Sequence, residues 1–173
     1  MSQFCGLTGK KYSLGNKIGT GGEGSVYEVL GSREIVAKVY RTDRIEDELS
    51  RITIERKLKV MIKMNIKPKI DNILRLAWPI DILYNQDQMV GFVMPAVTSS
   101  IRIWDIHMSG VAYGRFNINH PITQKVLRVY PNYTWKYSVQ ISYNLAWIVS
   151  YLHTKGVVIG DLSERNLMID TNT

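Results

Sequence analysis

The sequence has little cysteine and little proline, and it has no long hydrophobic run. Of its 173 residues one is cysteine and 5 are proline. The single cysteine, Cys5, excludes an internal disulfide, which favours a reducing compartment. No apolar run approaches the roughly 18 residues of a membrane-spanning helix, and residues 1–10 lack the basic-then-apolar pattern of a secretory signal. These absences predict a cytoplasmic protein with no membrane partner.

The composition is that of a globular protein with a basic surface. Hydrophobic residues make up 45% and charged residues 21%, which is compatible with a packed core. The 22 Lys+Arg exceed the 15 Asp+Glu and give a net charge of +7. A basic surface can bind nucleic acid. The densest basic cluster, over residues 56–69, alternates with apolar residues as on an amphipathic helix, so a solvated helix face is favoured over a nucleic-acid partner.

Residues 1–97 have the pattern of one β-rich lobe. Short β-forming segments separated by turn residues predict five strands, over residues 11–18, 25–30, 34–40, 73–84 and 88–94. Apolar residues at intervals of three and four predict one helix over residues 44–64. We therefore expect a five-stranded antiparallel sheet that carries one helix.

Residues 98–173 have the pattern of a second, mainly helical lobe. Residues 98–132 show no sustained periodicity and predict a linker with local structure. Residues 133–154 predict a long helix that ends before Gly156, with Trp135 and Trp147 in the helix core and His153 as a structural residue. The whole chain is therefore predicted to be an α+β protein of two lobes.

A glycine-rich string, G-x-G-x-x-G-x-V, occupies residues 19–26. A strand follows these glycines, whereas a dinucleotide-binding motif requires a helix there. The string therefore favours a hairpin whose backbone amides approach phosphate oxygens, since glycine permits close approach and positive φ. A glycine-rich turn without a ligand remains the alternative.

Lys38 lies on the strand predicted after this hairpin, and alternation points it away from the face of Ala37. A lysine at this place is a candidate phosphate ligand, although a single strand lysine can also simply face solvent. A carboxylate from the following helix would be needed to hold its ammonium group. Glu55 is preferred because it lies near the middle of the predicted helix, and Glu48 is the second candidate.

Residues 152–170 contain Asp161 and Asn166 at the spacing D-x-x-x-x-N. Together with the glycine-rich string and Lys38, they resemble the protein kinase superfamily, with motifs in the same order on the same elements. The segment also resembles a divergent bacterial group of kinase-like proteins. The fold implied by the resemblance is a kinase-like N-terminal lobe, residues 1–97, followed by an incomplete C-terminal lobe, residues 98–173.

The resemblance implies a protein kinase that uses ATP and Mg²⁺ on a protein substrate. Asp161 would orient the acceptor hydroxyl and take its proton, Lys38 would contact phosphates, Glu55 would hold Lys38, and Asn166 would ligate Mg²⁺. The remaining nucleotide-binding residues implied by the resemblance are Ile18, Gly19, Gly21, Gly22, Gly24, Val26, Ala37, Met94, Pro95 and Val97.

The sequence also departs from the kinase pattern. Gly160 stands where kinases usually carry the arginine of His-Arg-Asp, and Ser163 replaces the usual lysine, while Arg165 is placed as in tyrosine kinases. We expect serine or threonine as the acceptor rather than tyrosine. No Asp-Phe-Gly follows Asn166, so weak or absent activity of this chain alone is expected, with self-association or a completing protein partner. The alternative is a kinase-like binding or regulatory module without catalysis.

Overall fold

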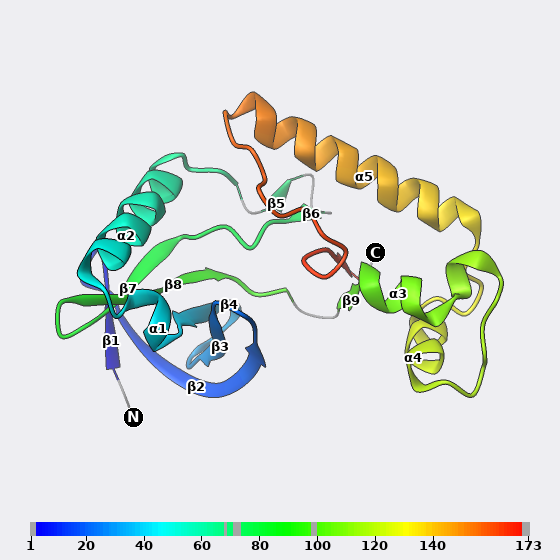
Figure 1. The fold of residues 1–173 in the computed structure, drawn as a ribbon, viewed down its shortest axis with the longest axis horizontal. Helices are drawn as coiled ribbons and strands as arrows, with labels where there is room; N and C mark the ends of the chain where they lie inside the picture. The colour runs from blue at the N-terminus through cyan, green and yellow to red at the C-terminus, as the bar shows by residue number, and fades with distance from the viewer. Residues whose placement is uncertain (1–2, 68, 71–73, 98–99, 171–173) are drawn as a thin grey trace. The chain divides into compact units, whose positions relative to one another are not determined.

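The computed structural model describes residues 3–67, 69–70, 74–97 and 100–170. The chain divides into two compact units, each of which is described by itself. The first unit comprises Met1–Ile70 and Arg75–Ala96, and the second comprises Asp71–Leu74 and Val97–Thr173. Figure 1 labels their helices and strands along the chain.

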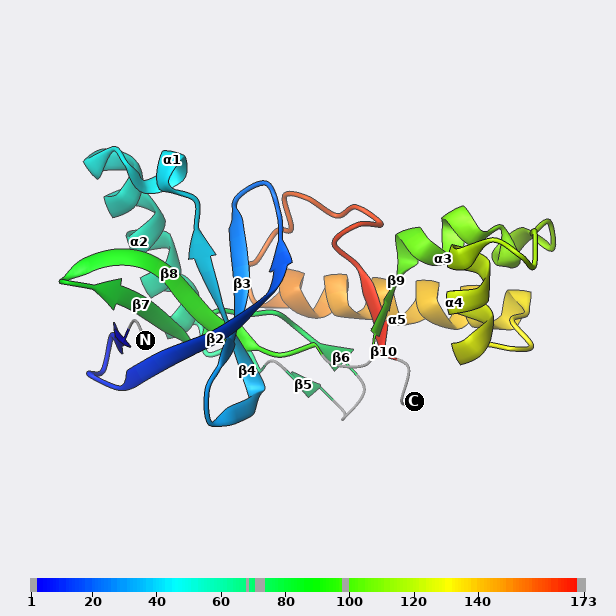
Figure 2. The same cartoon turned by 90° about the horizontal axis from the view of Figure 1, so that it is seen from below.

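The first unit is a closed antiparallel barrel, and Figure 2 labels five of its strands, β2, β3, β4, β7 and β8. Its strands are β1 (Gln3–Gly6), β2 (Lys11–Thr20), β3 (Gly24–Val29), β4 (Ser32–Tyr40), β7 (Asp81–Asn85) and β8 (Gln88–Pro95). Their order around the barrel is β1-β2-β3-β4-β8-β7. The expected kinase-like lobe with a five-stranded sheet is therefore wrong. A sixth strand, β1, pairs with both β2 and β7 and closes the sheet on itself.

The carboxylate of Asp81 connects the closing strands. It accepts hydrogen bonds from the backbone nitrogen of Leu7 at 2.8 Å and from the hydroxyl of Tyr12 at 2.7 Å. Burial and this bond raise the pKa of Tyr12, which keeps its hydroxyl a donor. A Cβ on Gly6 would collide with the Asp81 carboxylate, so a larger residue there would force this carboxylate to shift.

The barrel interior is apolar and small. Its buried residues are Tyr12, Val29, Ala37, Leu83 and Val93. These side chains alternate along their strands with residues that point outward. Burial of such a set removes apolar surface from water and is the main stabilising contribution to the unit.

The helix predicted over residues 44–64 is present as two helices, α1 (Thr42–Ile45) and α2 (Glu48–Lys63). Asp47 separates them, because its side chain caps α2 by accepting a hydrogen bond from the Ser50 nitrogen at 2.8 Å. Leu58 of α2 is buried against Ile82 and Phe92, which places α2 beside β7 and β8.

The strand predicted over residues 73–84 is much shorter in the structure. Its first residue, Ile73, lies outside the described residues, and β7 begins only at Asp81. Pro79 lacks the backbone hydrogen that a strand ladder uses, and the indole of Trp78 donates to the carbonyl of Met61 at 2.9 Å. Within the predicted range, β6 (Leu74–Arg75) is a separate strand of two residues, and β5 (Lys69–Ile70), also of two residues, precedes it.

The second unit contains one β pair and several helices. Its elements are β9 (Ser100–Arg102), α3 (Ile103–Ser109), the 3₁₀ helix η1 (Val111–Tyr113), α4 (Pro121–Val129), α5 (Trp135–Thr154) and β10 (Met168–Asp170). Residues 98–132 were expected to be a linker with local structure; instead, the described part of this range carries β9, α3, η1 and α4. Pro121 occupies the first turn of α4, where its missing amide hydrogen costs nothing, and His120 caps that helix.

The core of the second unit lies under α3 and α4. Ile101, Ile106, Val111 and Val126 form its buried cluster. Asp105 is buried beside it, and its carboxylate accepts from Lys125 at 2.7 Å and from Arg102 at 2.9 Å. These two cations compensate the charge that burial would otherwise disfavour.

Helix α5 is largely exposed along its length. Trp135 is 68% and Trp147 is 36% exposed, so the expectation that both lie in a helix core is wrong. His153 is exposed as well. Within the described ranges, no helix combines the length and the apolar character that crossing a bilayer requires.

Candidate functional site

Lys38 lies on β4 between two partner strands. Its register partners are Val26 on β3 and Phe92 on β8, so these three side chains share one face of the barrel wall. The ammonium group lies 5.7 Å from the ring centroid of Tyr40 and 5.8 Å from that of Phe92. Aromatic faces attract a cation and help to hold it in place.

The Lys38 ammonium forms an ion pair with Glu23, with 2.7 Å between Nζ and Oε2. This hydrogen bond and the positive charge of Lys38 lower the pKa of Glu23. Burial and the negative charge of Glu23 raise the pKa of Tyr40 to about 12. Glu23 was not predicted from the sequence. The available signal was a carboxylate within the glycine-rich turn, close before the strand that carries Lys38.

The structure does not bring Glu55 to Lys38. Glu55 pairs with Lys59 at 2.6 Å and accepts a hydrogen bond from the hydroxyl of Tyr84 at 2.9 Å. The bond from Lys59 outweighs burial and lowers the pKa of Glu55. Glu48, the second candidate, is the exposed first residue of α2.

The glycine-rich string forms a hairpin between β2 and β3. The Gly21 nitrogen donates to the Gly24 carbonyl at 2.8 Å and closes the turn. A Cβ on Gly24 would collide with the Val39 carbonyl, whereas a Cβ on Gly22 would meet open space. Gly24 is therefore required for the close approach of β3 to β4, and Gly22 leaves the outer side of the turn accessible. Gly19 pairs with Val26, and Ile18 is 54% exposed.

The residues expected around an adenine ring fall in different places. Ala37 is completely buried in the barrel interior, on the face opposite Lys38, because adjacent strand residues alternate. Met94 and Pro95 are half-buried near the end of β8. Val97 belongs to the second unit. Val26 pairs directly with Lys38, and Met94, two residues after Phe92 on β8, lies on the same face.

Asp161 and Asn166 lie in one loop of the second unit and contact each other. The Asn166 side-chain nitrogen donates to Asp161 Oδ2 at 2.8 Å and to the Asp161 backbone carbonyl at 3.4 Å. Both side chains are exposed. The bond restrains the direction of an otherwise exposed carboxylate.

The loop that carries this pair is anchored to the start of α3. The nitrogens of Ile103 and Trp104 donate to the carbonyls of Leu167 and Glu164 at 3.0 and 3.1 Å. The guanidinium of Arg165 lies 4.7 Å from the ring centroid of Trp104. The first amides of a helix have no partner within the helix, so α3 has two amides available to hold the loop.

The same pair supplies the oxygen atoms that a small divalent cation would use. Among the described residues, no cluster of three or more His, Cys, Asp or Glu side chains could enclose a metal ion. The Asp161 carboxylate and the Asn166 amide oxygen fit Mg²⁺ held chiefly by phosphate oxygens and water, which needs only one or two protein ligands.

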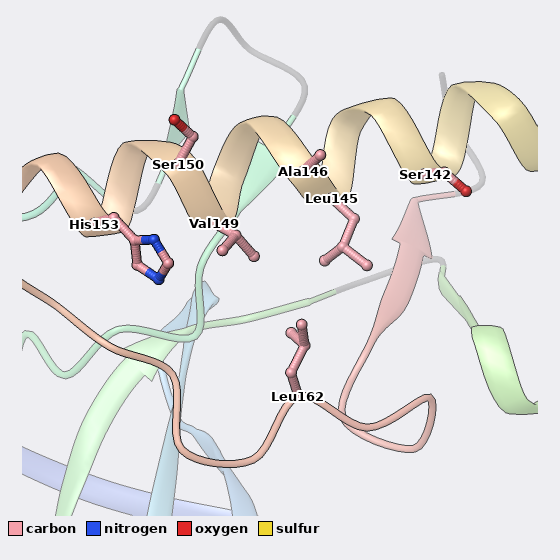
Figure 3. Close-up of a pocket in the computed structure, with 7 residues that line it drawn as sticks. All are labelled: Ser142, Leu145, Ala146, Val149, Ser150, His153 and Leu162. Atoms are coloured by element: carbon pink, nitrogen blue, oxygen red, sulfur yellow. The ribbon is translucent and has the colours of Figure 1, made fainter.

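A separate hollow lies between α5 and the same loop (Figure 3). It has a volume of about 470 Å³ and is lined by Ser142, Leu145, Ala146, Val149, Ser150, His153 and Leu162. Figure 3 shows Leu145 and Val149 pointing from α5 toward Leu162 of the loop. The lining is mostly apolar, and its polar side chains are those of Ser142, Ser150 and His153.

Comparison with known proteins finds distant relatives of the chain. No protein-family model matches the chain. The chain is 26% identical over 164 residues to Protein kinase YegI of Escherichia coli strain K12 and 25% identical over 164 residues to the protein of the same name from Escherichia coli O157:H7. Each alignment covers 94% of this chain and 22% of the relative, so the chain spans less than a quarter of the length of these relatives. The chain is thus distantly similar, over nearly its whole length, to proteins named as protein kinases.

Proposed function

We propose that this chain carries nucleotide-binding and acceptor-activating residues of a protein kinase that transfers the γ-phosphate of ATP to a protein hydroxyl. The observation that carries the proposal is the hydrogen bond between Asn166 and Asp161, at a spacing that resembles a kinase catalytic loop. The similarity of 94% of the chain to proteins named as protein kinases supports it.

In this proposal residues 1–97 bind the nucleotide. Lys38 contacts the α- and β-phosphates. Its partly buried ammonium group is held beside aromatic rings and so offers a positive charge at a fixed place to the negative phosphates. The backbone around Gly21, Gly22 and Gly24 covers the phosphates from the hairpin. Glu55 holds Lys38 when nucleotide is bound, which requires Glu55 to leave Lys59.

The apolar residues of the same part of the chain take the adenine. Ile18 and Val26 pack on the base from the hairpin, and Met94 and Pro95 border it from the end of β8. The half-buried state of Met94 and Pro95 supports their assignment, since a base needs apolar surface that is not already covered. Ala37 and Val97 contribute through backbone placement, because the Ala37 side chain is buried in the barrel.

In the second unit Asp161 acts on the acceptor. The acceptor oxygen attacks the γ-phosphorus, its proton passes to the Asp161 carboxylate, and the bond to the bridging oxygen breaks so that ADP leaves with the electron pair. Asn166, together with the phosphates, would hold Mg²⁺, and the ion would neutralise phosphate charge. Asn166 also holds the Asp161 carboxylate in one direction through its 2.8 Å bond.

Serine or threonine is the proposed acceptor. Arg165, the residue placed as in tyrosine kinases, already stacks on Trp104 at 4.7 Å. A guanidinium that anchors its own loop is less available to contact a substrate.

A second candidate function is a kinase-like binding module without phosphate transfer. The ion pairs Lys38–Glu23 and Lys59–Glu55 favour it, because Lys38, proposed to contact the phosphates, and Glu55, proposed to hold Lys38, each have another partner. In this case nucleotide binding would regulate an interaction with a protein partner.

One pair of measurements separates the two functions. Calorimetric titration of the 173-residue chain with ATP, with and without Mg²⁺, measures binding, and transfer of radiolabelled γ-phosphate to a mixed protein substrate measures catalysis. Binding with transfer supports the kinase, and binding without transfer supports the module. If ATP does not bind at all, both functions are rejected.

A further inference from the structure

The glycine-rich hairpin places a carboxylate on the lysine that the proposed function assigns to phosphate. Lys38 Nζ and Glu23 Oε2 are 2.7 Å apart, and the side chains are 23% and 62% exposed. The pair joins the turn between β2 and β3 to the middle of β4. Figure 2 shows these three strands side by side.

The backbone holds Glu23 at this place. The Arg41 nitrogen donates to the Glu23 carbonyl at 2.9 Å, and the Gly21 nitrogen closes the turn on the Gly24 carbonyl at 2.8 Å. The pairing of Gly24 with Tyr40 continues into the pairing of Val26 with Lys38. The Glu23 side chain therefore starts from a fixed point within reach of Lys38.

The surroundings of Glu23 favour an anion. Its pKa is lowered first by the bond and charge of Lys38, and further by the positive charges of Arg44 and Lys57. Tyr40 and Phe92 border the ammonium group with their rings. A phosphate group that enters this positive region meets the same cation that Glu23 already uses.

We propose that Glu23 is an internal competitor of the nucleotide, a carboxylate that occupies Lys38 until a polyphosphate displaces it. This inference rests on the proposed nucleotide binding and adds a residue that sets its affinity and specificity. A ligand gains from Lys38 only after it breaks the ion pair, so adenosine, which has no phosphate, is indifferent to Glu23. A nucleoside triphosphate must displace Glu23 from Lys38, so its binding affinity is lowered by the free energy of that ion pair.

The test compares affinities of the 173-residue chain and its variants for MgATP and adenosine by calorimetry. Glu23→Gln removes the competing charge and is expected to tighten MgATP binding by up to about fivefold, the range of a partly exposed ion pair. Glu23→Asp keeps the charge but shortens the side chain, so it loses reach and is also expected to tighten binding. Adenosine affinity is expected to stay unchanged in both variants.

Two further variants serve as controls. Glu34→Gln makes the same charge change at an exposed position of β4 and is expected to leave MgATP affinity unchanged. In the double variant Glu23→Gln/Lys38→Met the gain should disappear, because the competitor acts only through Lys38.

The possible results distinguish this inference from the proposed function. If MgATP binds the wild type and Glu23→Gln binds it no tighter, Glu23 is not a competitor, while nucleotide binding stands. An equal gain in Glu34→Gln, or wild-type affinity in Glu23→Asp, shows a general charge effect and also overturns the inference. If MgATP binds neither the wild type nor Glu23→Gln, the inference and the proposed function both fail.

Discussion

The side-chain amide of Asn166 donates a hydrogen bond of 2.8 Å to Oδ2 of Asp161. The two residues are five positions apart in the same loop, and this bond links their exposed side chains. The bond restrains one oxygen of the Asp161 carboxylate. Under the proposed function, this restraint would orient the carboxylate toward the acceptor hydroxyl.

We predict that Asp161→Asn abolishes phosphate transfer and leaves MgATP affinity nearly unchanged. The amide cannot take the acceptor proton, and loss of a positioned base costs about 10²- to 10⁴-fold in rate. Radiolabel transfer and calorimetry on the same preparations measure the two quantities. Asp87→Asn, in the exposed turn after β7, is the matched control. Equal transfer by the Asp161→Asn variant and the wild type would reject Asp161 as the base.

Lys38→Ala is expected to remove the rise in melting temperature that MgATP gives the wild type. A ligand that binds only the folded protein stabilises it by mass action, by about 2.7 kcal/mol at a concentration one hundred times its dissociation constant. Differential scanning fluorimetry across a series of MgATP concentrations measures the rise. Lys17→Ala, at an exposed position of β2, should retain it. A full rise in the Lys38→Ala variant would remove Lys38 from the nucleotide site.

Tyr12→Phe is expected to lower the free energy of unfolding by about 2 kcal/mol, because a hydrogen bond to a buried carboxylate is lost. The hydroxyl of Tyr12 is 2.7 Å from Oδ2 of Asp81, and the variant leaves that oxygen without this donor. Urea denaturation measures the change. Tyr27→Phe on β3 removes a hydroxyl for which the described residues provide no hydrogen-bond partner, and it should change stability little. Equal stability of Tyr12→Phe and wild type would show that the bond does not hold the barrel closed.

Asp105 predicts how the stability of the second unit depends on pH. Burial would raise its pKa, but hydrogen bonds from Lys125 and Arg102 outweigh burial and leave the pKa below its ordinary value of 3.8. The unfolded chain therefore binds a proton here at a higher pH than the folded chain does. This contribution to stability is complete above about pH 3.8 and is lost as pH falls through the lowered folded pKa.

Asp105→Asn is accordingly expected to lower the free energy of unfolding by about 2 kcal/mol at neutral pH. Its stability should also fall less steeply than that of the wild type as the pH decreases below 3.8. Urea denaturation at several pH values between neutrality and strong acid measures both effects. Asp87→Asn should follow the wild-type pH profile. A wild-type slope in Asp105→Asn would assign the acid sensitivity to other carboxylates.

The strands of the hairpins could be predicted from local patterns, but closure of the barrel could not. The pairs β2–β3 and β3–β4 join neighbours in sequence, and Gly31 at φ 84° marks the second turn. In contrast, β1 has only four residues. Its position depends on Asp81, which binds Tyr12 of the neighbouring strand β2 from 69 positions further along the chain. Alternation of apolar residues carries no information on such a distant partner.

Helices α3 and α4 were missed because short helices with caps lack a long apolar period. Gly110 and Gly114, at φ 71° and 64°, suggest an irregular segment, yet they end α3 and η1 in the left-handed conformation typical of helix ends. Pro121 after His120 was the available signal for α4.

Local patterns predict where some candidate residues lie, but not which side chains they contact. Strand alternation gave the face of Lys38 correctly, and the spacing of Asp161 and Asn166 anticipated a shared loop. The partner of Lys38 was not anticipated, because reaching Glu23 depends on how the hairpin turn folds over β4. The same holds for Glu55, whose neighbours on α2 and β7 compete for its carboxylate.

The hydrogen bonds from Leu7 and Tyr12 to Asp81 also constrain the order in which the barrel can be completed. During synthesis β1 is made first, and its partner β7, with the Asp81 carboxylate that holds β1 in place, is made about half a chain later. Until then the unfinished sheet has two open edges. Closing so long a loop is slow in comparison with forming hairpins. Nascent chains that stop short of β7 should therefore pair with one another through β1, whereas the finished barrel presents no free edge for such pairing.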